Sequence, residues 1–253
     1  MRITFLGTGT SHGVPMIGCD CATCRSPDPR DRRLRPSIYI EAAARLLVDA
    51  GPDLRAQALR HDIRRVDAIL FTHGHADHIL GMDDLRRFNT LQQGAIPCFG
   101  DAATLLDIRR TFSYVFDPAT PKGGGLPQLE LFEVLGGFCV ARSEVLPVPL
   151  FHGTRPILGY RLGRFAYLTD CSRIPDESWP LLEGLDVLVL DALRERPHPT
   201  HFSLAEAIDA ATRIGARQTW FTHMCHDLRH EPPSARLPAS MALADDGLVI
   251  EVH

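Results

Sequence analysis

Short apolar runs separated by polar segments recur along the chain, and each run predicts a β-strand. In the first half, the predicted strands are 1–7, 37–41, 45–49, 67–72 and 96–100. In the second half they are 129–134, 138–142, 144–150, 157–162, 165–169, 186–191 and 218–221. Between residues 129 and 150, apolar and polar positions alternate as expected for an antiparallel sheet.

Helical patterns lie between several of these runs. The predicted helices are 53–61, 77–87, 102–110 and 203–214. The last helix has the clearest start, because Ser203 is followed three positions later by Glu206, the pattern of a capping box. The proline- and glycine-rich stretch 117–125 predicts a loop on the surface.

Composition narrows the class of protein. The chain has 253 residues, of which 45% are hydrophobic, so it suits one large domain or two small ones. A formal net charge of −4 does not indicate a surface for nucleic acids. No apolar run is long enough to span a membrane, and residues 1–7 resemble a strand rather than a signal peptide. Seven cysteines, an odd number, favour metal binding in a reducing cytoplasm over a set of disulfides.

A cluster of histidines directly follows the predicted strand 67–72. His73, His75, Asp77 and His78 lie within six positions of one another. Imidazole and carboxylate groups suit zinc, manganese or iron. Packing alone is a poor explanation, because each buried ring would need a polar partner of its own. The cluster therefore predicts a metal site.

Other predicted strands also end at residues that bind metals. His152, Asp170 and His223 each follow an apolar run. Strand ends meet at one rim of a sheet, so we expect these side chains to lie near the histidine cluster. Seven donors are too many for one tetrahedral ion and suit two ions if one carboxylate bridges them. Two divalent ions about 3.5–4 Å apart can hold a phosphoryl group and activate water.

A second cluster lies near the N-terminus. Cys19, Cys21 and Cys24 provide three thiolates of a tetrahedral site and need a fourth ligand from elsewhere in the chain. A glycine-rich turn at 7–13 precedes them and could contact an anion, although a tight turn without that role explains it as well. The arginine-rich loop 25–35 follows, and we interpret it as solvated, with substrate attraction as the alternative.

The combined pattern resembles the metallo-β-lactamase superfamily. The residues that carry the resemblance are His73-x-His75-x-Asp77-His78 and the later His152, Asp170 and His223. The resemblance covers nearly the whole chain and implies an α/β fold, an αββα sandwich of two mixed β-sheets flanked by helices. It also implies a first ion held by His73, His75 and His152, a second held by Asp77, His78 and His223, and Asp170 as the bridge. Asp77 could in addition contact the attacking water.

The N-terminal pattern points to one branch of that superfamily. Gly7-Thr8-Gly9…Gly13-Val14-Pro15…Gly18-Cys19-x-Cys21-x-x-Cys24, together with His226, is similar to the branch that contains the phosphoribosyl cyclic phosphodiesterase of phosphonate breakdown. The resemblance implies that Cys19, Cys21, Cys24 and His226 hold a structural Zn²⁺. It also implies that His201 is a general acid, rather than His198 or a histidine without a role.

Two residues depart from the pattern of this branch. His12 stands where the cyclic phosphodiesterase has glutamine, and Cys171 follows Asp170 where threonine is expected. Both changes can alter the pocket, so the identity of the substrate does not transfer. Cys225 could compete as a ligand with its neighbours, but we expect it to pack inward because adjacent residues of an extended chain point to opposite sides.

We therefore expect a single domain over residues 1–253, with a structural-zinc loop at about 18–36. The expected activity is hydrolysis of a small, cyclic phosphodiester with two Mn²⁺ or Zn²⁺ ions, in the cytoplasm, by a chain that can form a homodimer. No membrane and no stable nucleic-acid partner are expected. The alternatives are lactone or thioester hydrolysis, tRNA 3′-end processing, and a non-hydrolytic role like that of the pyrroloquinoline quinone biosynthesis protein. The tRNA alternative is disfavoured because a basic arm is missing from the sequence.

Overall fold

The computed structural model describes residues 1–121, 125–231 and 237–252. Within this part of the chain, two β-sheets of seven strands each form the centre of the molecule. The first sheet has the strand order β14-β1-β2-β3-β4-β5-β6, and the second has the order β13-β12-β11-β10-β9-β8-β7. Part of each sheet is antiparallel and part is parallel, so both sheets are mixed.

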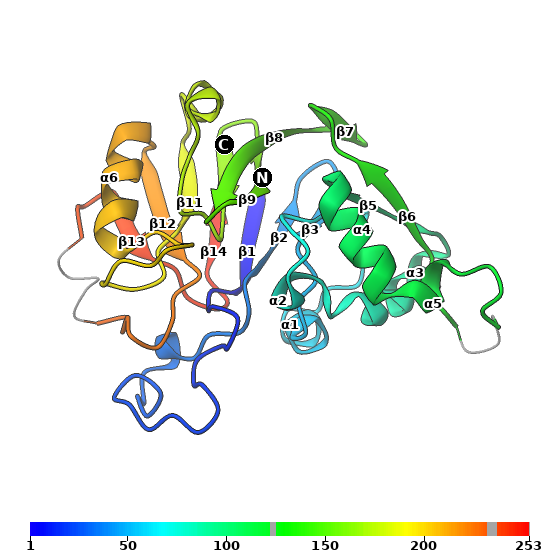
Figure 1. The fold of residues 1–253 in the computed structure, drawn as a ribbon, viewed down its shortest axis with the longest axis horizontal. Helices are drawn as coiled ribbons and strands as arrows, with labels where there is room; N and C mark the ends of the chain where they lie inside the picture. Colours follow the sequence, from blue (N-terminus) through cyan, green and yellow to red (C-terminus); the bar gives the residue numbers. More distant parts are fainter. Residues whose placement is uncertain (122–124, 232–236, 253) are drawn as a thin grey trace.

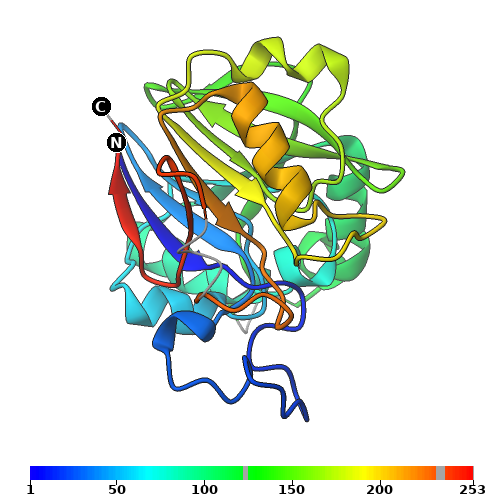
Figure 2. The ribbon, with the colours of Figure 1, turned by 90° about the vertical axis from the view of Figure 1, so that its left-hand side faces the viewer.

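The first sheet contains the N-terminal strands and the C-terminal strand. Its strands are β1 (Arg2–Gly7), β2 (Ser37–Glu41), β3 (Arg45–Val48), β4 (Ala68–Leu70), β5 (Ile96–Gly100), β6 (Leu129–Glu133) and β14 (Val249–Glu251). The pairs from β14 to β3 are antiparallel, and the pairs from β3 to β6 are parallel. Because β14 lies beside β1, the two ends of the chain are neighbours (Figures 1 and 2).

The second sheet is built from the later part of the chain. Its strands are β7 (Phe138–Val140), β8 (Ser143–His152), β9 (Arg155–Leu162), β10 (Phe165–Leu168), β11 (Val187–Asp191), β12 (Gln218–Thr222) and β13 (Met241–Leu243). The strands from β7 to β10 are antiparallel, and those from β10 to β13 are parallel. The parallel part therefore has the carboxyl ends of its strands at one rim.

Helices cover the outer faces of the two sheets (Figures 1 and 2). The α-helices are α1 (Leu54–Arg60), α2 (Ala76–Ile79), α3 (Arg86–Gln92), α4 (Ala102–Thr111), α5 (Ser113–Phe116) and α6 (Leu204–Ile214). Short 3₁₀ helices are η1 (Pro29–Asp31), η2 (Met82–Leu85), η4 (Asp176–Ser178) and η5 (Pro180–Leu182). No helix in the described ranges is long and apolar enough to cross a membrane.

Alternation along the strands explains how the layers pack. In β4, Ala68 and Leu70 point into the core between the sheets, whereas Ile69 points to the helices on the outer side. In β11, Val189 lies in the central core and Leu190 packs toward α6. Successive side chains of a strand face opposite ways, so strands that are apolar at every position bury both faces. The predicted αββα sandwich is confirmed.

Several predicted elements differ from the structure. The strand at 129–134 was expected to join an antiparallel sheet with its successors, but β6 pairs in parallel with β5 in the first sheet. The helix predicted at 77–87 is divided into α2, η2 and the start of α3. Gly81 lies at this division, where a Cβ atom would stand 2.0 Å from the Gly51 carbonyl oxygen. The predicted loop 117–125 includes residues 122–124, which lie outside the described ranges.

Candidate metal centre and active site

The histidine cluster begins where β4 ends, at the rim of the first sheet. His73 and His75 lie on the loop after β4, and Asp77 and His78 lie in α2. Gly74 lets this loop pass close to α4, since a Cβ atom there would stand 2.6 Å from Asp107. The short helix α2 places Asp77 and His78 at the same rim as the two loop histidines, and the ring centroids of His73 and His78 are 4.1 Å apart.

The three remaining donors follow strands of the second sheet. His152 is the last residue of β8, Asp170 follows β10, and His223 follows β12. Asp170 and His223 have φ angles of +55° and +61°, in the left-handed region that residues other than glycine rarely adopt. Backbone strain of this kind persists where the surrounding structure holds it, and it is common at functional sites.

Asp170 lies at the centre of the rim. Its carboxylate oxygens are 3.2 Å from Nε2 of His78, 3.1 Å from Nε2 of His223 and 4.0 Å from Nε2 of His73. Asp77 is 3.3 Å from Nε2 of His78 and 3.8 Å from Nε2 of His223. One carboxylate thus lies between histidines of both predicted ion sites, as a bridging ligand must.

The other side of the rim is formed by three imidazole rings. The His73 and His75 rings have centroids 4.5 Å apart, and the His152 ring lies 5.6 Å from His73 and 5.1 Å from His75. The structure therefore brings all seven predicted donors together. The pairing of each donor with one of two ions stays a prediction.

The burial of these donors and the direction of their pKa shifts are consistent with the binding of cations. Nε2 of His73, Nε2 of His78 and Nε2 of His223 are buried and make no hydrogen bond with the described residues. Burial lowers the pKa of His73 well below its ordinary value and also lowers the pKa of His75 and His152, which favours the neutral imidazole that binds metals. Burial opposes protonation of His78 as well, but Asp170, Asp77 and Asp49 outweigh it and raise the pKa of His78. A cation can replace that proton.

Two further contacts orient the donor rings. The Nδ1 atom of His78 donates to Asp49 at 2.7 Å, and Asp49 also accepts the Thr72 hydroxyl at 2.8 Å and the Thr72 amide at 2.9 Å. The Nδ1 atom of His152 donates to the carbonyl of Asp170 at 2.9 Å. Such bonds fix the tautomer and leave Nε2 free for a metal. Asp49 is a site residue that the sequence did not predict, because its only signal is its place at the end of the predicted strand 45–49.

His201 lies beside the seven donors and is buried, with 8% of its surface exposed. Its ring stacks on His223 with centroids 4.8 Å apart and meets His152 edge-on at 4.6 Å. Its Nδ1 atom donates to Asp191 at 3.2 Å, and Asp191 also accepts the Phe202 amide at 3.1 Å. His201 is thus not an ordinary surface histidine, and Asp191 holds it in place. Its role as an acid stays a prediction.

The cysteine cluster forms a second group of donors below the rim. Nδ1 of His226 lies 3.2 Å from Sγ of Cys19, 3.4 Å from Sγ of Cys21 and 3.8 Å from Sγ of Cys24. A hydrogen bond from the Cys24 amide lowers the pKa of Cys21 to about 6, whereas burial raises the pKa of Cys24 to about 11. These three sulfur donors and one nitrogen donor lie within 4.8 Å of one another, a set that suits a tetrahedral zinc ion. Cys225 is buried and lies outside this group of four.

The arginine-rich loop differs from the prediction. Arg33 is not solvated: it is buried, and its guanidinium donates to the carbonyls of Cys225 at 3.1 Å and Leu228 at 2.7 Å. Arg25 and Arg30 do lie at the surface, where each pairs with a nearby aspartate. Arg33 therefore fastens the cysteine loop to the segment after β12, and Figures 1 and 2 show these two segments side by side.

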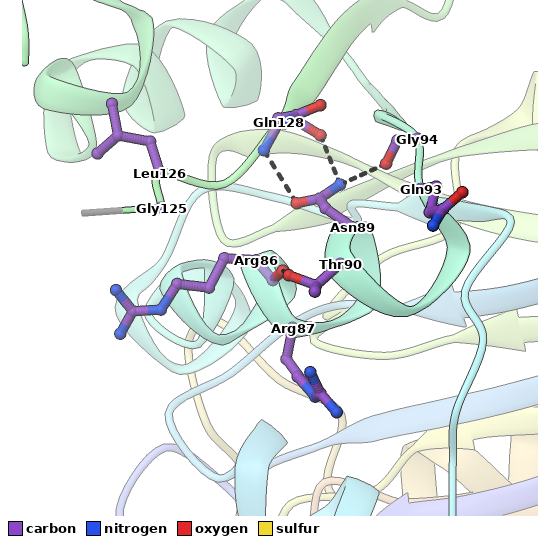
Figure 3. A pocket seen from close by; sticks show the side chains of 9 residues that line it. All are labelled: Arg86, Arg87, Asn89, Thr90, Gln93, Gly94, Gly125, Leu126 and Gln128. Atoms are coloured by element: carbon purple, nitrogen blue, oxygen red, sulfur yellow. Dashed lines mark hydrogen bonds between the residues drawn. The ribbon is translucent and has the colours of Figure 1, made fainter. Parts of the chain in front are cut away.

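Cavities do not all coincide with these clusters. A cavity of about 740 Å³ lies beside α3, where Asn89 donates to the carbonyls of Gly94 and Gln128 (Figure 3). Its lining contains no histidine, cysteine or carboxylate among the described residues, so metal chemistry has no donors there. A smaller cavity of about 260 Å³ is lined by His201 and His226. This second cavity adjoins the predicted site.

These features define a class of protein, the metal-dependent hydrolases built on two facing β-sheets with a metal site at the rim. A family model described as "Beta-lactamase superfamily domain" matches residues 44–224. A solved structure described as a new diphosphatase from the PhnP family is 46% identical, with a TM-score of 0.93, and the match covers 100% of this chain and 98% of that chain. The chain belongs to the beta-lactamase superfamily, and within it to the PhnP family.

Two curated relatives have other names. The octanoyltransferase of Porphyromonas gingivalis is 39% identical over 98% of this chain, but the chain spans only 51% of that relative's length. The coenzyme PQQ synthesis protein B of Methylobacterium nodulans is 28% identical, over 76% of this chain and 72% of the relative. The family and its diphosphatase member support a metal-dependent hydrolase.

Proposed function

We propose that the protein is a metal-dependent phosphodiesterase that hydrolyses a small, cyclic phosphodiester or a related phosphoanhydride. The observation that carries the proposal is the position of His201, which lies against His152 and His223 while Asp191 holds its Nδ1 atom. A phosphoryl group at the rim would have a proton donor within reach on one side. The diphosphatase of the PhnP family, at 46% identity, supports phosphorus chemistry in preference to carbon chemistry.

The chain's own residues would perform the steps around the phosphorus atom. When bound, two divalent ions supply positive charge and lower the pKa of water at the rim. Water adds its oxygen to phosphorus and loses one proton to solvent, and the bond between phosphorus and the leaving oxygen breaks with its electron pair going to that oxygen. Burial lowers the pKa of His201, so its protonated ring is a stronger acid than an exposed imidazolium. That protonated ring, whose Nδ1–H is held by Asp191, would give a proton from Nε2 to the leaving oxygen. The ring regains a proton from solvent.

Each of the seven donors would have a defined place in this site. His73, His75 and His152 would hold one ion, and Asp77, His78 and His223 would hold the other, with Asp170 between them. Asp77 would also contact the attacking water. Zn²⁺ and Mn²⁺ both suit these donors, and the cysteine cluster would hold a structural Zn²⁺. The single domain, the homodimer, the absence of nucleic-acid and membrane partners, and the cytoplasmic location stay predictions.

A substrate panel tests this function. The panel contains 2′,3′-cyclic nucleotides, a ribosyl cyclic phosphate, bis(p-nitrophenyl) phosphate, a lactone and an octanoyl thioester, each with added manganese or zinc. We expect turnover of at least one phosphodiester, and a loss of about 10²–10⁴-fold in His201→Ala with its metal content unchanged. His61→Ala, a histidine at the end of α1, is the matched control. Cleavage of the lactone or thioester with no phosphodiester turnover would contradict the proposal.

A further inference from the structure

The cavity of about 260 Å³ extends from His201 away from the seven donors. One wall is the glycine-rich turn at residues 10–13, a second is the loop 193–201, and a third is the segment that carries His226. Pockets that bury a whole small molecule usually measure about 300–1,000 Å³, so this cavity suits one part of a substrate. A phosphorus atom at the rim would place its leaving group here, because His201 lies between the rim and the cavity.

His198 contributes a hydrogen-bond donor to this cavity. Its Nδ1 atom accepts from the Thr200 amide at 3.4 Å and lies 3.2 Å from the Thr200 hydroxyl. In the neutral ring, a proton therefore sits on Nε2, which has no partner among the described residues. The ring is half-buried, and its centroid is 5.2 Å from that of His201. His198 can thus donate to a group that His201 has just released.

The glycine-rich turn contributes backbone donors on the opposite wall. The Gly13 amide donates to the Thr10 carbonyl at 2.8 Å, which closes a turn with Ser11 and His12 at its centre. In the described ranges, the amides of Ser11 and His12 make no hydrogen bond. Asp246 holds the base of the turn, because it accepts the Thr8 amide at 2.9 Å and the Thr8 hydroxyl at 2.8 Å. Successive free amides on a fixed turn suit an anion.

The second wall, the loop 193–201, also carries positive charge and is held in place by its own hydrogen bonds. Arg194 donates to the carbonyls of Arg196 at 3.2 Å and Pro197 at 3.1 Å, which holds the loop before His198 in place. The one carboxylate that lines the cavity among the described residues, Asp227, is paired with Arg196 at 2.6 Å. The cavity is therefore lined by several hydrogen-bond donors, and the negative charge of Asp227 is neutralised by Arg196.

We propose that this cavity is a leaving-group subsite that selects substrates whose leaving group carries a phosphoryl oxygen anion. The inference rests on the proposed function, since the leaving group exists only if the rim hydrolyses phosphate esters or anhydrides. In the favoured reaction, water adds its oxygen to one phosphorus of a diphosphate and loses one proton to solvent, and the anhydride P–O bond breaks. The second phosphate leaves with the electron pair, takes a proton from His201 and is held by His198 Nε2–H and the turn amides.

Two probes with different leaving groups test the subsite. P¹,P²-di(adenosine-5′) diphosphate releases AMP, whereas bis(p-nitrophenyl) phosphate releases an aryl group without phosphate. We expect His198→Ala and Ser11→Pro each to lose about tenfold or more in kcat/KM on the diphosphate and less than about twofold on the aryl ester. Proline at the first central position of a turn removes the amide donor with little strain.

Conservative variants separate hydrogen bonding from packing. His198→Gln keeps a donor near the position of Nε2, and Ser11→Ala keeps the amide, so both should retain most of the activity on the diphosphate. The subsite would be overturned if His198→Ala and Ser11→Pro lost kcat/KM equally on the two probes. It would also be overturned if both variants kept the wild-type kcat/KM on the diphosphate.

A binding measurement separates this proposal from the proposed function. If the wild-type protein hydrolyses neither probe, the proposed function fails, and calorimetric binding of AMP to the metal-loaded protein then tests the subsite. Affinity for AMP that is about tenfold weaker in His198→Ala supports the subsite. Equal affinity of the two proteins overturns it.

Discussion

The two groups of metal donors in this protein are built in opposite ways. The seven donors of the rim lie at or after the ends of β4, β8, β10 and β12, two of them in α2, and most of these side chains are buried. The cysteine cluster takes three donors from six consecutive positions, on a segment whose only regular element in the described chain is η1. None of the described residues 8–36 belongs to the three apolar cores.

This difference indicates what each ion would do. The sheets place the rim donors whether or not an ion is bound, because β-sheet packing already fixes the strand ends. The cysteine loop has no apolar core of its own, so a structural ion would supply much of its order. We therefore expect substitutions of the rim donors to abolish activity while the protein stays folded. Substitutions in the cysteine cluster should first reduce the order of the cysteine loop.

The largest effect is expected from Asp170→Asn at the centre of the rim. The substitution preserves shape but removes the charge that lies between His73, His78 and His223. We expect turnover to fall below detection and the content of rim metals to drop, while the apparent melting temperature of the metal-free protein changes little. Steady-state assays, elemental analysis and thermal unfolding check this. Loss of the folded state would show instead that the rim is needed for the fold.

A smaller loss is expected from Asp191→Asn. This carboxyl group orients His201 and lies 3.5 Å from Nδ1 of His223. Residues that orient a metal ligand or an acid typically contribute about 10–100-fold to activity, so we expect a loss of that size with both rim ions retained. The pH profile of kcat should also change, because an amide replaces the carboxyl group that is hydrogen-bonded to Nδ1 of His201. An unchanged profile and rate would mean that His201 needs no support from Asp191.

The cysteine cluster should respond in a different measurement. Cys21→Ser removes a thiolate that lies 3.4 Å from His226, and we expect one fewer ion and a melting temperature lower by at least about 3 °C. Activity should fall less than in the rim variants. Cys139→Ser is the matched control, since Cys139 is exposed and lies outside the cluster. A loss of rim metals in Cys21→Ser would show that the two groups of donors are not independent.

The base of the glycine-rich turn should make stability depend on pH without a change at either group of metal donors. Burial raises the pKa of Asp246 from 3.8 to about 6 in the folded state. Between these two values the folded protein holds a proton that the unfolded chain has lost, so this group makes stability fall as the pH rises. A shift of this size corresponds to at most about 3 kcal/mol. Denaturant unfolding from pH 4 to 7 should show a flatter profile in Asp246→Asn, and an identical slope would contradict the assignment.

In both groups of metal donors, the sequence predicted the ligands that are close together in the chain more readily than the contacts between distant residues. The spacing of His73 to His78 and of Cys19 to Cys24 was visible directly, and strand ends located His152, Asp170 and His223. The roles of Asp49 and Arg33 depend on contacts between residues far apart in the chain, which periodicity does not reveal. Arg33 was placed in a solvated loop because charge and nearby prolines were the only local signals.

The fold shows the same limit. Long apolar strands such as β11 and the capped helix α6 were predicted within a residue or two. The short strands β13 and β14 were missed, because three residues carry little pattern and β14 forms only by pairing with the first strand of the chain. The break at Gly81 depends on the close approach of Gly51, which is a tertiary contact. The sheet to which β6 belongs likewise depends on a tertiary contact, its parallel pairing with β5.

Metal content measured on three purified proteins tests the central claim most directly. The rim and the cysteine cluster together predict about three ions per wild-type chain, with the cluster's ion retained in Asp170→Asn and the rim ions retained in Cys21→Ser. Mass spectrometry under native conditions and elemental analysis give these numbers together. One ion in the wild-type protein, or the release of every ion by either substitution, would contradict two independent metal centres.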